Sequence, residues 1–377
     1  MSRFIAVPVG QGDAFHLESE GWSVLVDGGR SRYGFASAFQ TATEADGASV
    51  VVCTHNDADH TDGIIGFLEA GFKCGELWLP GRWLGALPSV LRPFVEVFED
   101  LVNSFKERDA GVSSIEAYAE QLDDSSNEVS TTEKELSVGE DGWPEQYIHL
   151  LEQAQPWEIW PMYCPWPEGW LWPKLHRLRP SDVQLLWSAI EAAGRIRAIA
   201  IEAFHRGIPV RWFEFDTVDP KIGNLPLQPL NARLIALVRP LVGPLLNLLA
   251  LTVSNKESPV FWYPPNDKHP GVLFTADSDL TGISLPGQLQ NVLATAPHHG
   301  SEENAKAYRK VNQKANSVTW VRSDGRYQKR PGQTYLSLAS PRFCTLCRSP
   351  SCSKQAVHLV VQGGAWTPQG TRLCQCR

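Results

Sequence analysis

Four side chains of the types that bind metal ions occur within six residues, directly after an apolar run. Residues 50–54 read Val-Val-Val-Cys-Thr, which is typical of a buried strand, and His55, Asp57, Asp59 and His60 follow. Crowded carboxylates repel one another and lose hydration unless a cation or a hydrogen-bond donor compensates. A loop after a strand can bring alternate residues together, so the pattern predicts a divalent metal site. A mixed set of imidazole and carboxylate suits zinc, manganese or iron.

Three further groups of ligand type each stand directly after an apolar run: Asp27, Asp277 and the pair His298 and His299. Taken singly, each has an ordinary structural explanation as a turn former, a helix cap or a surface histidine. Their joint occurrence with the loop at 55–60 favours one site assembled from several strand ends.

This order of motifs resembles the metallo-β-lactamase superfamily, whose signature is a strand-end Asp, an HxHxDH loop, a later Asp and a final His. The closer resemblance is to the branch found in the soluble domain of the competence DNA-uptake channel and in phosphorylcholine esterases. In that branch an Asp replaces the second His of the loop, as Asp57 does in this chain. The resemblance covers residues 1–80 and 248–325, well under half of the chain. It is carried by VGQGDA at 9–14, THNDADHTDG at 54–63, Ser254-Asn255 with Ser258, TAD at 275–277 and PHHGS at 297–301.

The resemblance implies a dinuclear metal site that acts through a bridging hydroxide. One ion, zinc or manganese, would bind His55, Asp57 and a bridging Asp277. The second ion would use the following ligands: Asp59, His60, Asp277 and one histidine of the 298/299 pair, of which His299 is favoured.

The resemblance also implies roles for the neighbours of these ligands. Asp57 or Asp59 would hold the hydroxide in line with the scissile bond, and His298 would lie against the substrate or leaving group. Asp27 would orient the metal-binding loop from behind the ligands. No His stands where the third metal-binding His of the superfamily would fall. Asn255 lies nearest and is expected beside the ligands, and His269 is a lesser candidate for that position.

The implied fold class is α/β, as an αββα metallo-β-lactamase sandwich with a helical, Trp/Pro-rich insertion. Strand-like runs in residues 1–80 indicate a first lobe, and those in 208–377 a second lobe with a Cys-rich tail. Residues 81–207 read as a mostly helical insertion with an acidic linker. In detail, the pattern predicts a helix over 62–72 and a strand over 248–253.

The formal net charge of −8 is segregated along the chain. Residues 110–146 carry ten acidic residues against one lysine, whereas residues 305–355 carry eleven basic residues against one aspartate. The basic segment follows the His298/His299 loop and predicts a phosphate-bearing substrate, such as nucleic acid or a nucleotide. The residues expected to grip its phosphates are Arg322, Arg326, Lys329 and Arg330. We therefore expect a phosphodiesterase or nuclease. Another ester or lactam hydrolase is the alternative, because the fold alone does not choose the substrate.

A second alternative, from a different class, is a binding or regulatory module in a multi-protein assembly. Its basis is a run of tryptophans among prolines: Trp143, Trp157, Trp160, Trp166, Trp170 and Trp172. Such a surface could bind a protein partner, stack on bases or cap the active site. Packing in the insertion's own core is the simpler explanation.

Five cysteines fall in the last 34 residues: Cys344, Cys347, Cys352, Cys374 and Cys376. Their short spacings predict an additional structural zinc on four of the five, with free thiols or an oxidised pair as alternatives.

No apolar run reaches the roughly 18–20 residues of a membrane span. The first residues lack the apolar stretch and cleavage site of a signal peptide. The expectation is a cytoplasmic protein with no membrane partner, whose cysteines serve as thiols or metal ligands.

Overall fold

The structure is a computed structural model that describes residues 2–105, 114–124, 134–154, 178–217, 225–251, 257–287, 289–327, 329–349 and 352–376. The chain is a mixed α/β protein that divides into two compact units. Unit 1 consists of Met1–Leu79, Phe213–Leu234 and Asn255–Arg377, and unit 2 of Pro80–Trp212 and Ile235–Ser254. Residues 81–207, the expected insertion, fall in unit 2. Residues 235–254, expected in the second lobe, also cluster with it.

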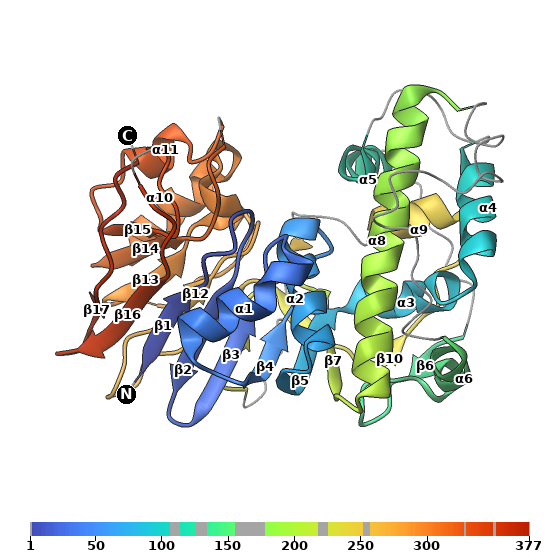
Figure 1. The fold of residues 1–377 in the computed structure, drawn as a ribbon, viewed down its shortest axis with the longest axis horizontal. Helices are drawn as coiled ribbons and strands as arrows, with labels where there is room; N and C mark the ends of the chain where they lie inside the picture. The colour runs from blue at the N-terminus through green and yellow to red at the C-terminus, as the bar shows by residue number, and fades with distance from the viewer. Residues whose placement is uncertain are drawn as a thin grey trace. The chain divides into compact units, whose positions relative to one another are not determined.

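Unit 1 contains two sheets (Figure 1). Among the described residues the larger sheet has nine strands, in the order β17 (Ala365–Pro368), β16 (Val357–Gln362), β1 (Arg3–Ala6), β2 (Phe15–Ser19), β3 (Trp22–Val26), β4 (Gly47–Val52), β5 (Lys73–Pro80), β7 (Val210–Phe215) and β9 (Ala232–Leu234). In the same part of the chain the smaller sheet has six, in the order β15 (Arg342–Cys344), β14 (Val318–Arg322), β13 (Val292–Thr295), β12 (Val272–Phe274), β11 (Phe261–Tyr263) and β8 (Gln228–Pro229).

The apolar runs of the sequence become parallel strands in the middle of each sheet. β3, β4 and β5 are parallel, as are β12, β13, β14 and β15. Parallel strands are buried on both faces, which explains their continuous apolar character. Parallel strands also end at the same edge of a sheet, where Val26 pairs with Val52 and Thr295 with Val321. The ligand-type residues that follow these strands are therefore brought together.

The two sheets share one core, and helices cover their other faces. Phe4 of the first sheet lies 6.0 Å from Phe274 of the second, and Trp78 lies 5.7 Å from Phe261, between ring centroids. Helix α1 (Arg32–Thr43) packs with α2 (Ala58–Glu69) beside the first sheet. On the second sheet, α10 (Ala305–Lys314) packs Tyr308 against Trp320. The remaining short helices of unit 1 are η2 (Pro297–Gly300), η3 (Glu302–Asn304) and α11 (Gln333–Leu336).

Helix α2 begins at Ala58, four residues before the predicted start at Asp62. Its first turn is closed by the Asp57 carbonyl, which accepts the backbone N–H of His60 at 3.0 Å and the Thr61 hydroxyl at 2.7 Å. The predicted helix began too late because the polar residues Asp59 and His60 interrupt the apolar periodicity of its first turn. Asp59 and His60 are consequently presented by a helical turn rather than by a loop.

Unit 2 is mainly helical in the part that the structure describes. Its elements are α3 (Gly81–Val90), α4 (Phe94–Ser104), α5 (Ile115–Asp124), β6 (Leu136–Ser137), α6 (Glu145–Gln153), α8 (Pro180–His205), β10 (Leu237–Val238) and α9 (Leu245–Leu251). The predicted strand at 248–253 is wrong over its described part, because residues 248–251 belong to α9. Short leucine-rich runs suit a buried helix or a strand equally, and here the run packs on α4 and α5.

Trp143 lies in the core of unit 2, edge-on to Phe204 and Trp212. The other five tryptophans of the expected partner surface lie outside the described residues. Among the helices described, none is both long and apolar enough to cross a bilayer.

Candidate metal centre

Two histidines from distant parts of the chain face each other in unit 1. His60 comes from the first turn of α2 and His299 from η2, and their Nε2 atoms lie 3.2 Å apart. The Nδ1 of His60 lies 2.8 Å from Asp27 Oδ2, and the Nδ1 of His299 lies 2.9 Å from Asp13 Oδ1. A carboxylate accepts only, so each Nδ1 carries the proton and donates it. The Nε2 atoms are therefore the ring nitrogens that remain to face the centre and each other. Two ligands of one tetrahedral zinc ion lie about 3.3 Å apart, as bond lengths of about 2.0–2.1 Å require.

Asp277, in the turn that follows β12, lies between two groups of ligand atoms. Its Oδ1 is 3.3 Å from His60 Nε2, and its Oδ2 is 3.6 Å from the Nε2 of His55. One group consists of His55, Asp57 and Asp277, and the other of Asp13, His60, Asp277 and His299; within each, the ligand atoms lie within 4.8 Å of one another. Asp59 adds Oδ2 at 3.3 Å from His299 Nε2. Asp13 lies behind His299, so we read it as an orienting residue rather than a ligand.

The His55 ring is held by two hydroxyl groups. The Thr54 hydroxyl group donates its proton to Asp27 Oδ2 at 2.8 Å. The oxygen of that hydroxyl group, Thr54 Oγ1, can therefore accept a hydrogen bond from His55 Nδ1 at 3.0 Å. Ser258 Oγ lies 3.3 Å from that nitrogen. The opposite nitrogen, Nε2, is buried and has no hydrogen-bond partner, although Asp57 Oδ2 lies 3.6 Å away. A buried ring nitrogen that has no hydrogen-bond partner and lies beside two carboxylates suits a metal ligand.

The electrostatics of the centre also call for a cation. Burial raises the pKa of Asp277, but the charges of His60, His298 and His55 outweigh burial and hold that pKa well below its ordinary value. Burial lowers the pKa of His60, while Asp277 and Asp27 raise it by more, so the net shift is well upward. The pKa of His299 is likewise lowered by burial and raised further by Asp13. Without a metal the buried carboxylates draw protons onto the histidines, and a divalent ion would supply the same positive charge.

Close backbone contacts set these positions. A Cβ atom on Gly63 of α2 would lie 1.8 Å from the carbonyl oxygen of Gly28, and one on Gly12 would lie 1.8 Å from that of Asp59. The turn after β3 and the loop before β2 therefore pack directly on the start of α2. These contacts fix Asp27 against His60 and bring Asp13 beside the centre.

The backbone at the centre is strained. Four non-glycine residues near the centre have positive φ: Asp27 (59°), Ala276 (46°), His298 (47°) and His299 (53°). Such conformations persist where the surrounding structure imposes them, and they cluster at functional sites. His298 turns its Nε2 to within 3.6 Å of Asp277 Oδ2 and keeps 26 % of its side chain exposed, whereas His299 is buried.

Arg322 differs from the expectation that it grips substrate, because its side chain is fully buried. Its Nε donates to the His299 carbonyl at 2.7 Å, and its other nitrogens donate to the Leu346 carbonyl, the Gly325 carbonyl and the Asp324 carboxylate. An arginine that is fully buried and donates four hydrogen bonds to protein acceptors is not available to a phosphate. It holds the His299 backbone in place instead.

The other three predicted basic residues lie nearer to solvent. Lys329 and Arg326 are exposed, but Arg326 donates to the carbonyls of Cys347 (3.3 Å) and Cys352 (2.5 Å). Arg330 places its guanidinium 4.8 Å from the centroid of the Tyr327 ring and 3.5 Å from Asp324. The pKa of Tyr327 is raised, first by burial and then by Asp324, and it also responds to Arg330, Asp59 and Arg30. Tyr327 thus lies within electrostatic reach of the centre and of two arginines.

Some predicted positions fall elsewhere. Asn255 lies outside the described residues, so the structure does not place it. His269 stacks on Tyr263 at 4.6 Å between ring centroids and approaches the Pro270 carbonyl, and it belongs to neither ligand group. Sequence reasoning assigned no role to Asp13, Thr54 or Ser258. The motif VGQGDA that contains Asp13 was the available signal for the first of them.

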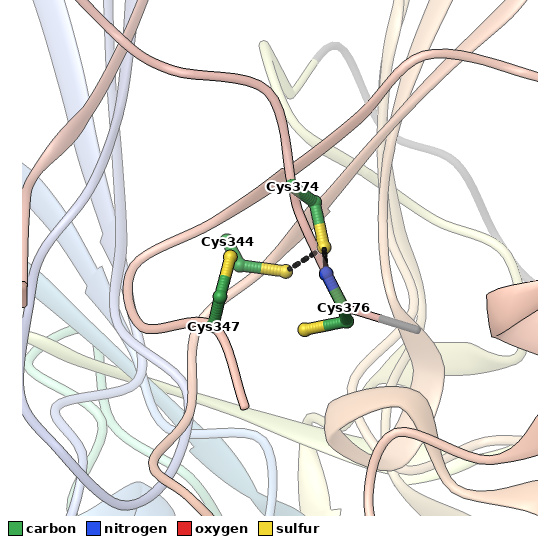
Figure 2. Close-up of side chains that lie close together, drawn as sticks. All are labelled: Cys344, Cys347, Cys374 and Cys376. Carbon is green, nitrogen blue, oxygen red and sulfur yellow. Dashed lines mark hydrogen bonds between the residues drawn. The ribbon is translucent and has the colours of Figure 1, made fainter. Parts of the chain in front are cut away.

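Of the five C-terminal cysteines, the structure brings together Cys344, Cys347, Cys374 and Cys376 (Figure 2). The fifth, Cys352, lies outside that group, and its Sγ is 3.5 Å from the Gln375 side-chain oxygen.

Neither a search with protein-family models nor a search of curated proteins finds a match to this chain. Function is therefore inferred from the geometry of its own residues.

Proposed function

We propose that the chain is a metal-dependent hydrolase with a dinuclear centre in unit 1. The observation that carries this proposal is the pair of facing Nε2 atoms of His60 and His299, each ring oriented by a buried carboxylate on its other nitrogen. A metal ion bound by both Nε2 atoms would replace the protons that the buried carboxylates otherwise draw onto these rings. Carboxylate–histidine–metal arrangements are the usual solution in zinc proteins.

A metallo-β-lactamase-type αββα fold is the architecture we propose for unit 1. It is supported by two sheets with a shared core, by α1 and α2 beside one sheet and by α10 on the other. The order of the ligand groups along the chain, each after a strand, supports the same fold.

The residues present fit two divalent ions, zinc or manganese. His55, Asp57 and Asp277 would hold one. The ligands of the other would be Asp59, His60, Asp277 and His299. When bound, such a pair supplies Lewis acidity toward a phosphoryl or carbonyl oxygen and lowers the pKa of water to near neutrality. Asp27, Asp13 and Thr54 fix the rings of the ligands.

His298 and the two loop carboxylates form the open side of the centre. The side chains of Asp57 and Asp59 are 19 % and 17 % exposed, against 2 % for Asp277. His298 is the most exposed histidine of the group, and its Nε2 lies 3.6 Å from Oδ2 of Asp277, the residue proposed to bridge the two ions. We assign it to the leaving group, to which its imidazole would give a proton, and we assign Asp57 and Asp59 to orienting the attacking water.

A phosphodiester is the substrate class we propose, in nucleic acid or in a nucleotide. Arg330 lies over the Tyr327 ring, and Lys329 is exposed on the same segment. Arg30 donates to the Gln11 side-chain oxygen at 3.2 Å, and the Gln11 amide nitrogen donates to Asp59 Oδ2 at 3.5 Å. Two arginines beside an open dinuclear centre favour an anionic substrate over a neutral ester or lactam.

The metal-centre proposal is tested with the full-length protein and the His60→Ala variant. We expect about two ions per wild-type centre and loss of at least one in the variant. Hydrolysis should fall by more than about 100-fold, since even orienting residues of metal sites are worth 10–100-fold. His149→Ala, which alters an exposed histidine of unit 2, is the matched control. Full metal content in His60→Ala would refute the centre.

The substrate proposal is tested by offering the zinc- or manganese-loaded protein bis-p-nitrophenyl phosphate, DNA, RNA and cyclic nucleotides, with a carboxylic ester and a β-lactam in parallel. Arg330→Ala should raise KM for a diester by about tenfold, because a charge-assisted hydrogen bond is worth about 1.5–3 kcal/mol. The effect should shrink at high salt. Lys268→Ala, an exposed lysine paired with Glu20, controls for net charge. Turnover of the uncharged substrates alone would overturn the phosphodiesterase assignment.

A further inference from the structure

Four cysteine thiols converge where the C-terminal segment returns to the edge of the second sheet. Cys344 ends β15, Cys347 follows in the next turn, and Cys374 and Cys376 come from the last residues of the chain. All four Sγ atoms lie within 4.8 Å of one another, and Figure 2 shows the side chains gathered around a common centre. Cys344, Cys347 and Cys376 are buried. Four thiols in one small volume match the donor set of a tetrahedral thiolate zinc site.

Backbone N–H groups point at these sulfurs. Gln375 N–H donates to Cys347 Sγ at 3.2 Å, Arg348 N–H to Cys376 Sγ at 3.3 Å, and Cys376 N–H to Cys374 Sγ at 3.4 Å. Such donors stabilise negative sulfur, because a neutral thiol is a weak acceptor and a thiolate a strong one. The turns around the cysteines can thus stabilise negative sulfur, and a bound zinc ion would neutralise that charge.

A pair of disulfides explains the cluster less well. All four cysteines are free thiols in the structure, with Cys344 Sγ 2.9 Å from Cys374 Sγ. All four sulfurs also approach a single centre rather than forming two separate pairs. Disulfide sulfurs carry no charge and would leave the three N–H donors without a strong acceptor.

We infer that Cys344, Cys347, Cys374 and Cys376 bind one structural zinc ion, with Cys352 excluded. The site closes the C-terminal segment onto the turn at 344–347. That turn supplies the Leu346 carbonyl to Arg322 and the Cys347 carbonyl to Arg326. Because Arg322 also holds the His299 carbonyl, the zinc would stabilise the strained loop of the separate His/Asp centre. This last clause alone rests on the proposed function.

The zinc site is tested first on the wild-type protein, so that no variant has to fold. An organomercurial that captures thiols is added stepwise in the presence of a colorimetric zinc indicator. We expect about one zinc ion to be released per protein molecule once about four thiols have been blocked. Zinc-edge X-ray absorption of protein that carries only this ion should show sulfur neighbours at about 2.3 Å. Disulfide-linked peptides in place of free thiols, or no sulfur neighbours, would overturn the inference.

Two variants then distinguish the four ligands from the neighbouring cysteine. Cys347→Ser should lose the thiolate-bound zinc, and cobalt-substituted protein should lose its sulfur-to-cobalt charge-transfer absorption. Cys352→Ser is the matched control and should keep both. Zinc loss in Cys352→Ser, or retention of zinc in Cys347→Ser, contradicts the assignment.

The link to the other centre has its own readout. In Cys347→Ser we expect the affinity of the His/Asp centre for added metal to fall by about tenfold, the lower end of what orienting interactions contribute. If that centre binds no metal in the wild type either, the proposed hydrolase function fails while the thiolate zinc stands. If it binds equally well in both proteins, the proposed coupling is wrong.

Discussion

Asp13 offers the sharpest test of how the metal centre is oriented. Its carboxylate is buried, one oxygen accepts from His299 Nδ1 at 2.9 Å, and the other, Oδ2, has no hydrogen-bond partner. Burial raises the pKa of Asp13, and His299 opposes that rise. Asp13→Asn keeps the shape but removes the charge, and its amide can present an oxygen or an NH2 group to His299 Nδ1, so the proton on Nδ1 is held less firmly. Metal affinity should fall 10–100-fold, which corresponds to about 1.4–2.7 kcal/mol.

Metal-free stability should change differently in this variant. The substitution removes a buried carboxylate that is only half satisfied, which offsets part of the hydrogen bond that it loses. We therefore expect the free energy of unfolding without metal to change less than the metal-induced stabilisation does. At saturating metal, that stabilisation should decrease by the same 1.4–2.7 kcal/mol or so, because it follows the logarithm of Kd.

The assay is urea unfolding with chelator and at a buffered free-zinc concentration, for wild type and variant. Asp267→Asn, at an exposed aspartate, is the control. An equal metal-induced stabilisation in wild type and Asp13→Asn would refute the orienting role.

Two further predictions concern stability. Burial, and next the charge of Arg3, lowers the pKa of His16 to about 3, below its unfolded value of 6.5. The buried neutral imidazole therefore contributes fully to stability above pH 6.5, and this contribution is lost as the pH falls from 6.5 toward 3. Between pH 7.5 and 5 the wild type should lose about 2 kcal/mol more than His16→Leu in urea unfolding, and equal slopes would contradict this. Gly63→Ala should cost about 1–3 kcal/mol by overpacking and weaken metal binding, because its Cβ meets the Gly28 carbonyl oxygen at 1.8 Å. Gly287→Ala, with nothing within 4 Å, should be neutral in the same thermal unfolding and metal titration.

Much of the candidate centre could be predicted because its ligands follow strongly apolar strands. Residues 55–60, Asp277 and His299 each stand where such a strand ends, and parallel pairing brings those ends together. The start of α2 was not predictable in the same way, since ligand residues interrupt the apolar period. The helix at Leu245–Leu251 was missed because an apolar run of that length suits a helix and a strand alike.

The roles of the supporting residues were hidden for a different reason. Asp13 reaches His299 across 286 positions, and the pattern around Asp13 does not reveal that partner. Arg322 stands in a basic segment and looks like a surface residue. Arg322 is buried because its guanidinium donates to the backbone carbonyls of His299, Leu346 and Gly325. Every residue type has a backbone carbonyl, so the sequence does not reveal these partners.

The distance along the chain between the two facing histidines has a consequence for biosynthesis. His60 and His299 are separated by 239 positions, so the ribosome makes one roughly 10–50 s before the other at about 5–20 residues per second. For most of that interval the nascent chain carries His55, Asp57, Asp59 and His60 without Asp277 and His299, which would complete the proposed coordination. Metal captured then would be held by an incomplete set and easily exchanged. If the proposed ions bind, a complete set of ligands exists for them only at the final stage of synthesis, when unit 2 has already emerged and the second sheet can dock on the first.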